Sequence, residues 1–104
     1  MLSLNKIRED LEEIRYYYAR KEMFDAAFGI VGNNMIFDTV KKYNKAVQNA
    51  PLRLYQLYLC LYVKNYTQES LASELGYTPE YIQMQHKKLL LFLQSYFKSE
   101  GERK

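Results

Sequence analysis

The sequence predicts an all-α protein of about five helices, and three observations indicate this fold class. Hydrophobic residues recur every three or four positions along most of the 104-residue chain, which is the spacing of a helix face. Only two prolines and four glycines are available for turns, and no stretch alternates apolar and polar residues between hairpin turns. The proportions of hydrophobic residues (48%) and charged residues (26%) are typical of a globular chain, and the length suits a single domain.

Residues 1–49 are predicted to form an N-terminal helical pair. The first helix, over residues 3–28, has an apolar face made of Leu4, Ile7, Leu11, Ile14 and Tyr18, broadened by Phe24 and Phe28. Two glycines and two asparagines in residues 29–34 are typical of a helix end and a turn. The second helix, over residues 35–47, places Val40, Tyr43 and Val47 on one side. We expect this pair to serve dimerisation or contact with a partner.

The segment 51–97 is predicted to hold the remaining three helices. Pro51 suits the first turn of a helix that reaches residue 64. Thr67 can cap a short helix over residues 68–75, because its hydroxyl can accept a hydrogen bond from a free backbone N–H group. The residues of this short helix expected to face inward are Leu71, Ala72 and Leu75.

The last helix is predicted to follow a tight turn of about three residues. Gly76 can take the left-handed conformation that ends a helix. Thr78 is a good N-cap, and Pro79 suits the first position of a helix that runs to about residue 97. A short helix, a tight turn and a second helix make a helix-turn-helix unit.

A resemblance to a known family covers about residues 51–97. Ala72, Gly76 and Ile82 stand at the offsets that helix-turn-helix units use, in the stretch YLCLYVKNYTQESLASELGYTPEYIQMQHKKLLLFL. This stretch resembles the DNA-binding region-four domain of sigma factors. The whole chain is similar to small phage-encoded regulators of the ArpU type. The resemblance implies a DNA-binding transcriptional regulator, with RNA polymerase as a possible partner.

The same stretch departs from the family pattern in two places. Gln85 stands at a position of the last helix that is usually aliphatic. Primary sigma factors carry several arginines along this helix, where this chain has Tyr81, Gln83 and Met84. These departures argue against promoter recognition of the primary kind.

The helix beginning at Pro79 is the expected recognition helix, with its N-terminal residues in the major groove of double-stranded DNA. An outward stripe at positions i, i+3, i+4 and i+7 suits Gln83 for a bidentate contact to adenine and Glu80 for a cytosine amino group. Lysines and the start of the preceding helix would meet phosphate. The predicted DNA-contacting residues are Thr67, Gln68, Thr78, Glu80, Gln83, Met84, Lys87 and Lys88. The alternative interpretation of the stripe is a solvated helix face.

Charge neither demands nor excludes nucleic acid as a partner. The chain carries fifteen basic and twelve acidic residues, a net charge of +3. Between Thr67 and Lys88, however, two lysines stand against Glu69, Glu74 and Glu80, so this unit is net negative. Weak DNA affinity is therefore expected of a monomer.

Enzymatic activity, a metal site, a cofactor and a small-molecule substrate are not expected. His86 is the only histidine and has no Cys, His or carboxylate partners at ligand spacing, which favours a helix flank or a phosphate contact. Cys60 lies in an apolar run, as a small core residue does. No Ser/His/Asp set or phosphate-cradling glycine loop is present.

The sequence is also expected to belong to a cytoplasmic protein without membrane contact. A single cysteine excludes an internal disulfide framework and suits a reducing compartment. The longest apolar runs, residues 57–63 and 89–93, are far shorter than the ~20 residues that span a bilayer. Charged residues from position 6 onward interrupt any signal-peptide core.

Tyrosines and a leucine-rich run raise the possibility of a protein partner. Eleven tyrosines occur, and Tyr55, Tyr58, Tyr62 and Tyr66 form one helical stripe, which suits either a core with hydroxyls at its rim or a partner-facing surface. Five successive apolar residues, 89–93, surround a helix on all sides, so we expect a homodimer in which a second copy covers one side. The alternative function is a protein-interaction module, a phage-type adaptor or inhibitor that keeps the fold.

Overall fold

The protein is described by a computed structural model over residues 2–21 and 35–102. Within these ranges the chain is all-helical, with α1 (Leu4–Ala19), α3 (Met35–Val47), α4 (Leu52–Tyr58), α5 (Gln68–Leu75) and α6 (Pro79–Glu102). A π-helical segment, η1 (Leu59–Val63), continues α4 without a break. The five α-helices of the described residues, without a strand among them, confirm the predicted all-α fold class.

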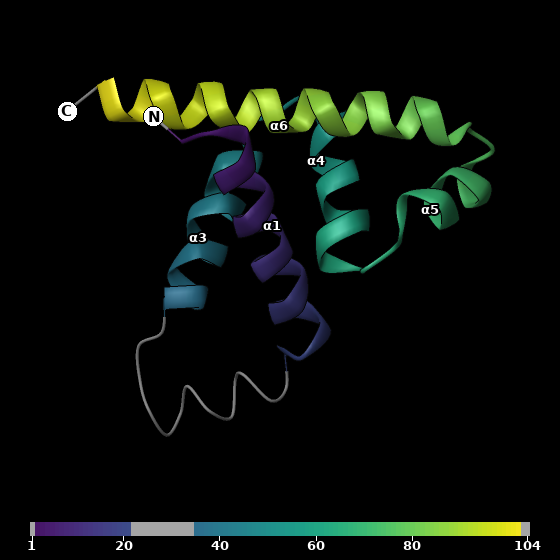
Figure 1. The fold of residues 1–104 in the computed structure, drawn as a ribbon, viewed down its shortest axis with the longest axis horizontal. Coiled ribbons are helices and arrows are strands. Elements are labelled where there is room, and N and C mark those ends of the chain that lie inside the picture. Colours follow the sequence, from purple (N-terminus) through teal and green to yellow (C-terminus); the bar gives the residue numbers. More distant parts are fainter. Residues whose placement is uncertain (1, 22–34, 103–104) are drawn as a thin grey trace.

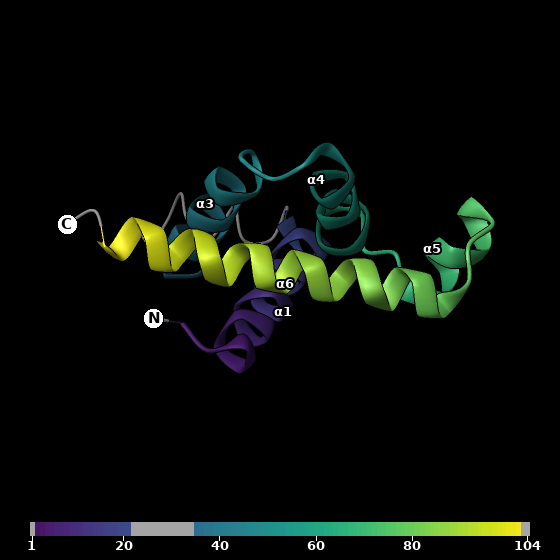
Figure 2. The same cartoon turned by 90° about the horizontal axis from the view of Figure 1, so that it is seen from above.

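The long helix α6 is the element on which the other helices assemble. It runs along one side of the molecule, with α1, α3 and α4 packed against it (Figure 1). Seen from above, α6 crosses these helices, and its N-terminal end projects beyond α4 to meet α5 (Figure 2). The α5 end of the molecule is therefore set apart from the N-terminal helices.

Helix α1 begins where the sequence predicts but ends at Ala19, with Arg20 as its C-cap, whereas the sequence predicts one helix over residues 3–28. The hydroxyl of Ser3 accepts a hydrogen bond from the backbone N–H of Lys6 at 3.1 Å, which caps the helix. The predicted bounds of the second helix, 35–47, agree with α3. Phe24, Phe28, Gly29, Gly32, Asn33 and Asn34 lie outside the described residues.

The predicted third helix is present but is not α-helical throughout. Its last five residues form the π-helical segment η1, after which Asn65 takes a left-handed conformation at φ 64°. Arg15 of α1 supports this end of the helix. Its Nε donates to the carbonyl oxygen of Leu61, and its Nη2 donates to that of Tyr66, each at 3.1 Å. Carbonyl groups near the helix end thereby gain partners, as helix termini require.

The core lies between α6 and the helices α1, α3 and α4–η1, and tyrosines fill much of it. Tyr43 and Tyr58 are fully buried. The hydroxyl of Tyr43 donates to the buried carboxylate of Asp10 at 2.7 Å, and that of Tyr58 donates to Asn44 Oδ1 at 2.7 Å. Asn44 in turn donates to the hydroxyl of Tyr18 at 2.9 Å. These bonds satisfy the polar ends of rings whose bodies are removed from water.

The tyrosine stripe of the third helix therefore serves the core for most of its length. Tyr58 and Tyr62 are buried and Tyr55 is half-buried, whereas Tyr66, past the end of the helix, is 36% exposed. Of the two alternatives for this stripe, the structure supports a core with hydroxyls at its rim.

The leucine-rich run of α6 is covered mainly by its own chain. Leu89, Leu90 and Leu93 are buried, Phe92 is half-buried and only Leu91, at 45% exposure, faces outward. The expectation that a second copy covers one side of this run stays a prediction: α1, α3 and α4 pack on the helix, and Leu91 marks the side that they leave open. Among the described residues no helix is long and apolar enough to cross a bilayer.

Candidate nucleic-acid interface

Helix α5 is held at its start by reciprocal hydrogen bonds. The hydroxyl of Thr67 accepts from the backbone N–H of Ser70 at 3.0 Å, and the hydroxyl of Ser70 accepts from the backbone N–H of Thr67 at 3.0 Å. This capping box satisfies two backbone N–H groups at the helix terminus. Thr67, predicted to contact phosphate, is exposed but already acts as the cap, and Gln68 beside it is half-buried.

The turn between α5 and α6 has the geometry that the sequence predicts. Gly76 adopts a left-handed conformation at φ 75°, and the backbone N–H groups of Gly76 and Tyr77 both donate to the carbonyl oxygen of Ala72. The hydroxyl of Thr78 accepts from the backbone N–H of Tyr81 at 3.1 Å and so caps α6. Thr78 is exposed, like Thr67, and its side chain is also engaged in a cap.

Helices α5 and α6 meet through small and aliphatic residues. Leu71, Ala72 and Ile82 are almost completely buried at this contact and agree with the prediction. Leu75, predicted to face inward, is instead 54% exposed. The reason is that α5 packs on α6 and η1 but makes no contact with α4, so the side of α5 that carries Leu75 is left open.

The predicted outward stripe of α6 lies on the surface. Glu80, Gln83, Met84 and Lys87 are all exposed, and so is Lys88. They occupy the N-terminal part of α6, which extends beyond α4 at one end of the molecule (Figure 1). These side chains are free of hydrogen bonds and ion pairs with the residues that the structure describes.

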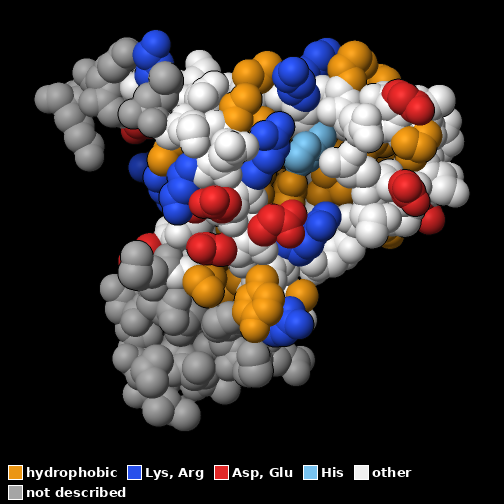
Figure 3. Space-filling view, viewed as in Figure 1, with side chains coloured by type: hydrophobic (Ala, Val, Ile, Leu, Met, Phe, Trp, Pro, Cys, Tyr) orange, Lys and Arg blue, Asp and Glu red, His pale blue; other side chains and the backbone are white. Residues whose placement is uncertain are grey.

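The electrostatic character of this end is mixed. Glu69, Glu74 and Glu80 are exposed, and they outnumber Lys87 and Lys88. In the space-filling view, Asp and Glu side chains and hydrophobic side chains lie at the α5 end, whereas Lys and Arg side chains lie mostly over the middle of the molecule (Figure 3). This face therefore carries no single basic patch over α5.

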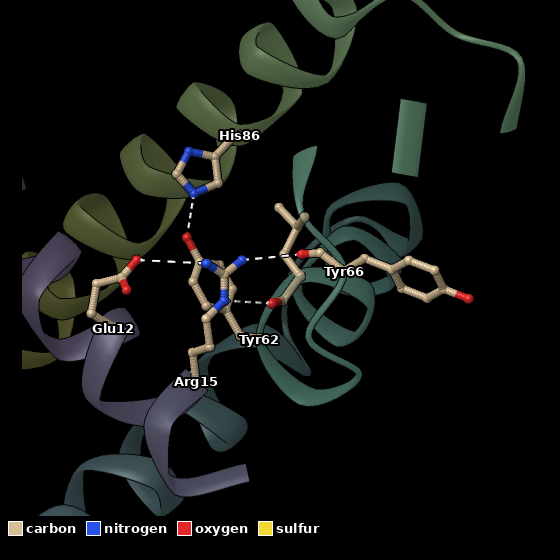
Figure 4. Close-up of polar contacts among 6 residues, drawn as sticks. Glu12, Arg15, Tyr62, Tyr66 and His86 are labelled. Carbon is tan, nitrogen blue, oxygen red and sulfur yellow. Dashed lines mark hydrogen bonds and ion pairs between the residues drawn. The ribbon is translucent and has the colours of Figure 1, made fainter. Parts of the chain in front are cut away.

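His86 takes part in a contact that the sequence analysis missed. Its Nε2 lies 2.5 Å from the hydroxyl of Tyr62 in η1, and the guanidinium of Arg15 sits 5.2 Å from the centre of the Tyr62 ring (Figure 4). Arg15 also pairs with Glu12 at 4.0 Å. His86 is half-buried and its ring contacts Tyr62, which is compatible with the expected helix flank, and a phosphate contact stays a prediction.

Burial determines the protonation of this contact. It lowers the pKa of His86 from its usual 6.5, and the positive charges of Arg8 and Arg15 lower it further. Burial also raises the pKa of Tyr62 to about 12. His86 is therefore neutral and Tyr62 keeps its proton, and the two share a hydrogen bond between the hydroxyl and Nε2. The spacing did hold a signal, because His86 stands four residues after Ile82 and three before Leu89, both of which are core residues.

No group of three or more His, Cys, Asp and Glu side chains suited to a metal ion occurs in residues 2–21 and 35–102. Cys60 is a half-buried free thiol. Comparisons of the chain with models of protein families, with curated proteins and with solved structures gave no match.

Proposed function

We propose that the protein is a sequence-specific DNA-binding transcriptional regulator of phage or mobile-element type, acting in the cytoplasm. In this proposal α5, the turn and α6 are a helix-turn-helix unit, and the N-terminal part of α6 reads the major groove. The observation that carries the proposal is the placement of Glu80, Gln83 and Lys87 as an exposed stripe on a helix whose start is fixed by a capped turn.

The side chains of the stripe divide into base readers and phosphate contacts. Gln83 has both a donor and an acceptor for adenine, and the carboxylate of Glu80 accepts from a cytosine amino group. Lys87 and Lys88, about one turn after Gln83 along α6, neutralise phosphate. The hydroxyl of Thr78 accepts from the backbone and retains its hydrogen for phosphate oxygen, whereas that of Thr67 already donates to Ser70 Oγ and must rotate to reach phosphate.

A homodimer belongs to this proposal because of the charge of the unit. Three glutamates against two lysines between Thr67 and Lys88 leave a single copy with little attraction for phosphate. Two copies on two half-sites double the number of base contacts, and the half-sites then lie about one helical turn apart. The half-exposed Leu91 and the N-terminal helices are the surfaces proposed for pairing.

The second candidate function is a protein-interaction module, an adaptor or inhibitor that binds a protein such as RNA polymerase. One observation favours it: Met84 and Leu91, 49% and 45% exposed, stand seven residues apart on the outward side of α6. This spacing aligns two apolar side chains along one face, as in helices that bind protein grooves. The net negative charge of the surrounding unit also suits a protein partner better than DNA.

Selection from a random duplex library at about 0.15 M salt tests the first proposal, with sedimentation run in parallel for the oligomeric state. The expected result is an enriched site with two half-sites and a dimer. The matched control is the triple variant Gln83→Ala/Lys87→Ala/Lys88→Ala, whose exposed side chains are not needed for folding and which should enrich nothing. Failure of the wild-type chain to enrich any site overturns the DNA-binding proposal and favours the interaction module.

A further inference from the structure

An open groove separates α4 and η1 from α5 and the start of α6. Its volume is about 610 Å³, which lies within the usual range for small-molecule sites. The groove exists because α5 does not reach α4, which leaves Leu75 on its wall rather than in a closed core. It lies on the inner side of α6, whereas Glu80, Gln83 and Lys87 lie on the outer side.

The walls of the groove are mainly apolar and aromatic. Leu57, Leu71 and Ile82 contribute aliphatic surface. Tyr77 and Tyr81 also line it, with ring centroids 4.6 Å apart and planes tilted by 35°. Surfaces of this kind favour a ligand with a flat or extended apolar body.

Gln85 adds a polar group to the groove. Its side chain lines the groove and the residue is only 5% exposed. The amide makes no hydrogen bond with any residue that the structure describes, and its polar atoms are not among buried unsatisfied groups, so they reach the solvent of the groove. A ligand atom that donates or accepts here would take the place of water. Position 85, which is usually aliphatic in helix-turn-helix units, thus carries a hydrogen-bonding group that a ligand in the groove can reach.

The charges that line the groove are of one sign. Arg53 of α4 and Lys64, which follows η1, are both exposed, and the lining contains no carboxylate. Neither cation forms an ion pair with a described residue. An anionic group would therefore be attracted from solvent and could form charge-assisted hydrogen bonds with them.

We propose that this groove binds a small aromatic carboxylate, or a molecule with the same arrangement of an apolar body and an anionic end. The ring lies against the aliphatic and tyrosine side chains, the positive charges of Arg53 and Lys64 attract the carboxylate, and Gln85 bonds to a polar atom. The ligand is bound without chemical change. The inference is independent of the proposed DNA binding, because it uses the opposite side of α6 and is tested without DNA.

Cys60 provides a direct reporter, because it is the only cysteine in the chain and lines the groove. The rate at which N-ethylmaleimide alkylates Cys60 is measured in the full chain with increasing naphthalene-2-carboxylate. The uncharged naphthalene-2-carboxamide serves as the matched probe. We expect saturable protection by the carboxylate, and half-protection by the carboxamide only at a concentration about tenfold higher, because it lacks the charge-assisted contacts.

Substitutions at Arg53, Lys64 and Gln85 assign the contacts. Arg53→Gln and Lys64→Gln should each reduce the preference for the carboxylate, whereas Lys45→Gln on α3, outside the groove, should leave it unchanged. Gln85→Leu should weaken binding of both probes about fivefold through loss of one hydrogen bond. Gln85→Glu, of similar size, should weaken the carboxylate selectively by repulsion. Thermal unfolding followed by circular dichroism verifies that each variant is folded.

Two results would overturn the proposal. One is unchanged alkylation of Cys60 up to millimolar carboxylate. The other is equal protection of Cys60 by the carboxylate and the carboxamide that is unchanged in Arg53→Gln and Lys64→Gln. Such a result would indicate non-specific adsorption to an apolar surface. Either result leaves the outcome of the DNA selection unaffected.

Discussion

The two ends of α6 differ in what surrounds them. Around Leu89 and Leu93 the helix is enclosed by α1, α3 and α4, and both side chains are fully buried. Around Gln83 and Met84 the helix has α5 on one side and solvent on the other. One helix thus serves as the core of the molecule along its middle and as a surface at its N-terminal end. Substitutions along it should accordingly divide into those that change stability and those that change binding.

The largest expected effect is on stability, at the enclosed end. Leu89→Ala removes a fully buried side chain and leaves a cavity, so we expect the free energy of unfolding to fall by about 2–5 kcal/mol. Leu75→Ala makes the same chemical change at a half-exposed position of α5 and should cost at most about 0.5–1 kcal/mol. Urea unfolding followed by circular dichroism measures both. Equal losses would show that the α5 end is as well packed as the core.

The next largest effect is on DNA affinity and concerns the exposed N-terminal part of α6, which is proposed to recognise bases. Gln83→Ala should weaken binding to the selected site by about 1–3 kcal/mol and relax the preference at one base pair, because a bidentate contact is lost. Stability should not change, since the side chain is exposed. Gln48→Ala, an exposed glutamine outside α6, is the matched control and should leave binding as it is.

Lys87→Ala distinguishes phosphate contacts, which position the protein on DNA, from the base contacts that recognise the sequence at the same surface. It should weaken all sequences alike and reduce the salt dependence by about one released counterion, without changing the preferred base. Fluorescence anisotropy on cognate and scrambled duplexes at several salt concentrations distinguishes the two variants. If Gln83→Ala and Lys87→Ala both leave binding unaltered, the recognition face is assigned wrongly.

The turn that joins the open end to α5 gives a smaller and strictly local effect. Gly76→Ala places a Cβ at φ 75°, and nothing lies within 4 Å of that Cβ, so the cost is backbone strain alone. We expect a loss of about 1–2 kcal/mol in the free energy of unfolding. Gly76→Asn should cost less, because asparagine tolerates the left-handed conformation. A larger loss for asparagine than for alanine would contradict this explanation.

The features that could be predicted from the sequence are those determined by residues close together in the chain. Thr67, Gly76 and Thr78 act within three or four residues of themselves, so their caps and the turn between α5 and α6 follow from residue type. The exposure of Glu80, Gln83 and Lys87 also follows, because helical spacing fixes which side chains share a face.

Features that depend on how helices are placed relative to one another could not be predicted in this way. The exposure of Leu75 depends on the gap between α4 and α5, and the cover over Leu90 depends on neighbours far away in sequence. The π-helical turn over residues 59–63 is supported by Arg15, 46 residues before the carbonyl of Leu61 to which it donates. Nothing in the local pattern of either segment specifies that pairing.

The smallest effect links the two regions through His86, the residue of α6 that lies between Gln83 and Leu89 and contacts Tyr62. Burial, followed by Arg8 and Arg15, lowers the pKa of His86 in the folded protein below its usual 6.5. As pH falls through 6.5 the unfolded chain therefore takes up a proton that the folded chain resists, so stability is retained above this pH and lost below it. One such proton can account for at most about 0.7 kcal/mol between pH 7 and 6.

Urea unfolding of the wild-type chain and of His86→Gln between pH 7.5 and 5.5 measures this linkage. His86→Gln should be less stable at pH 7.5 if the Tyr62 contact matters, yet its stability should vary less with pH, because the titrating group is gone. Tyr62→Phe removes the hydroxyl that shares a hydrogen bond with Nε2 but keeps the histidine buried, so most of the pH dependence should remain. If Tyr62→Phe abolishes it as fully as His86→Gln does, the hydrogen bond rather than burial determines the protonation of His86, and α6 is held to η1 mainly by that contact.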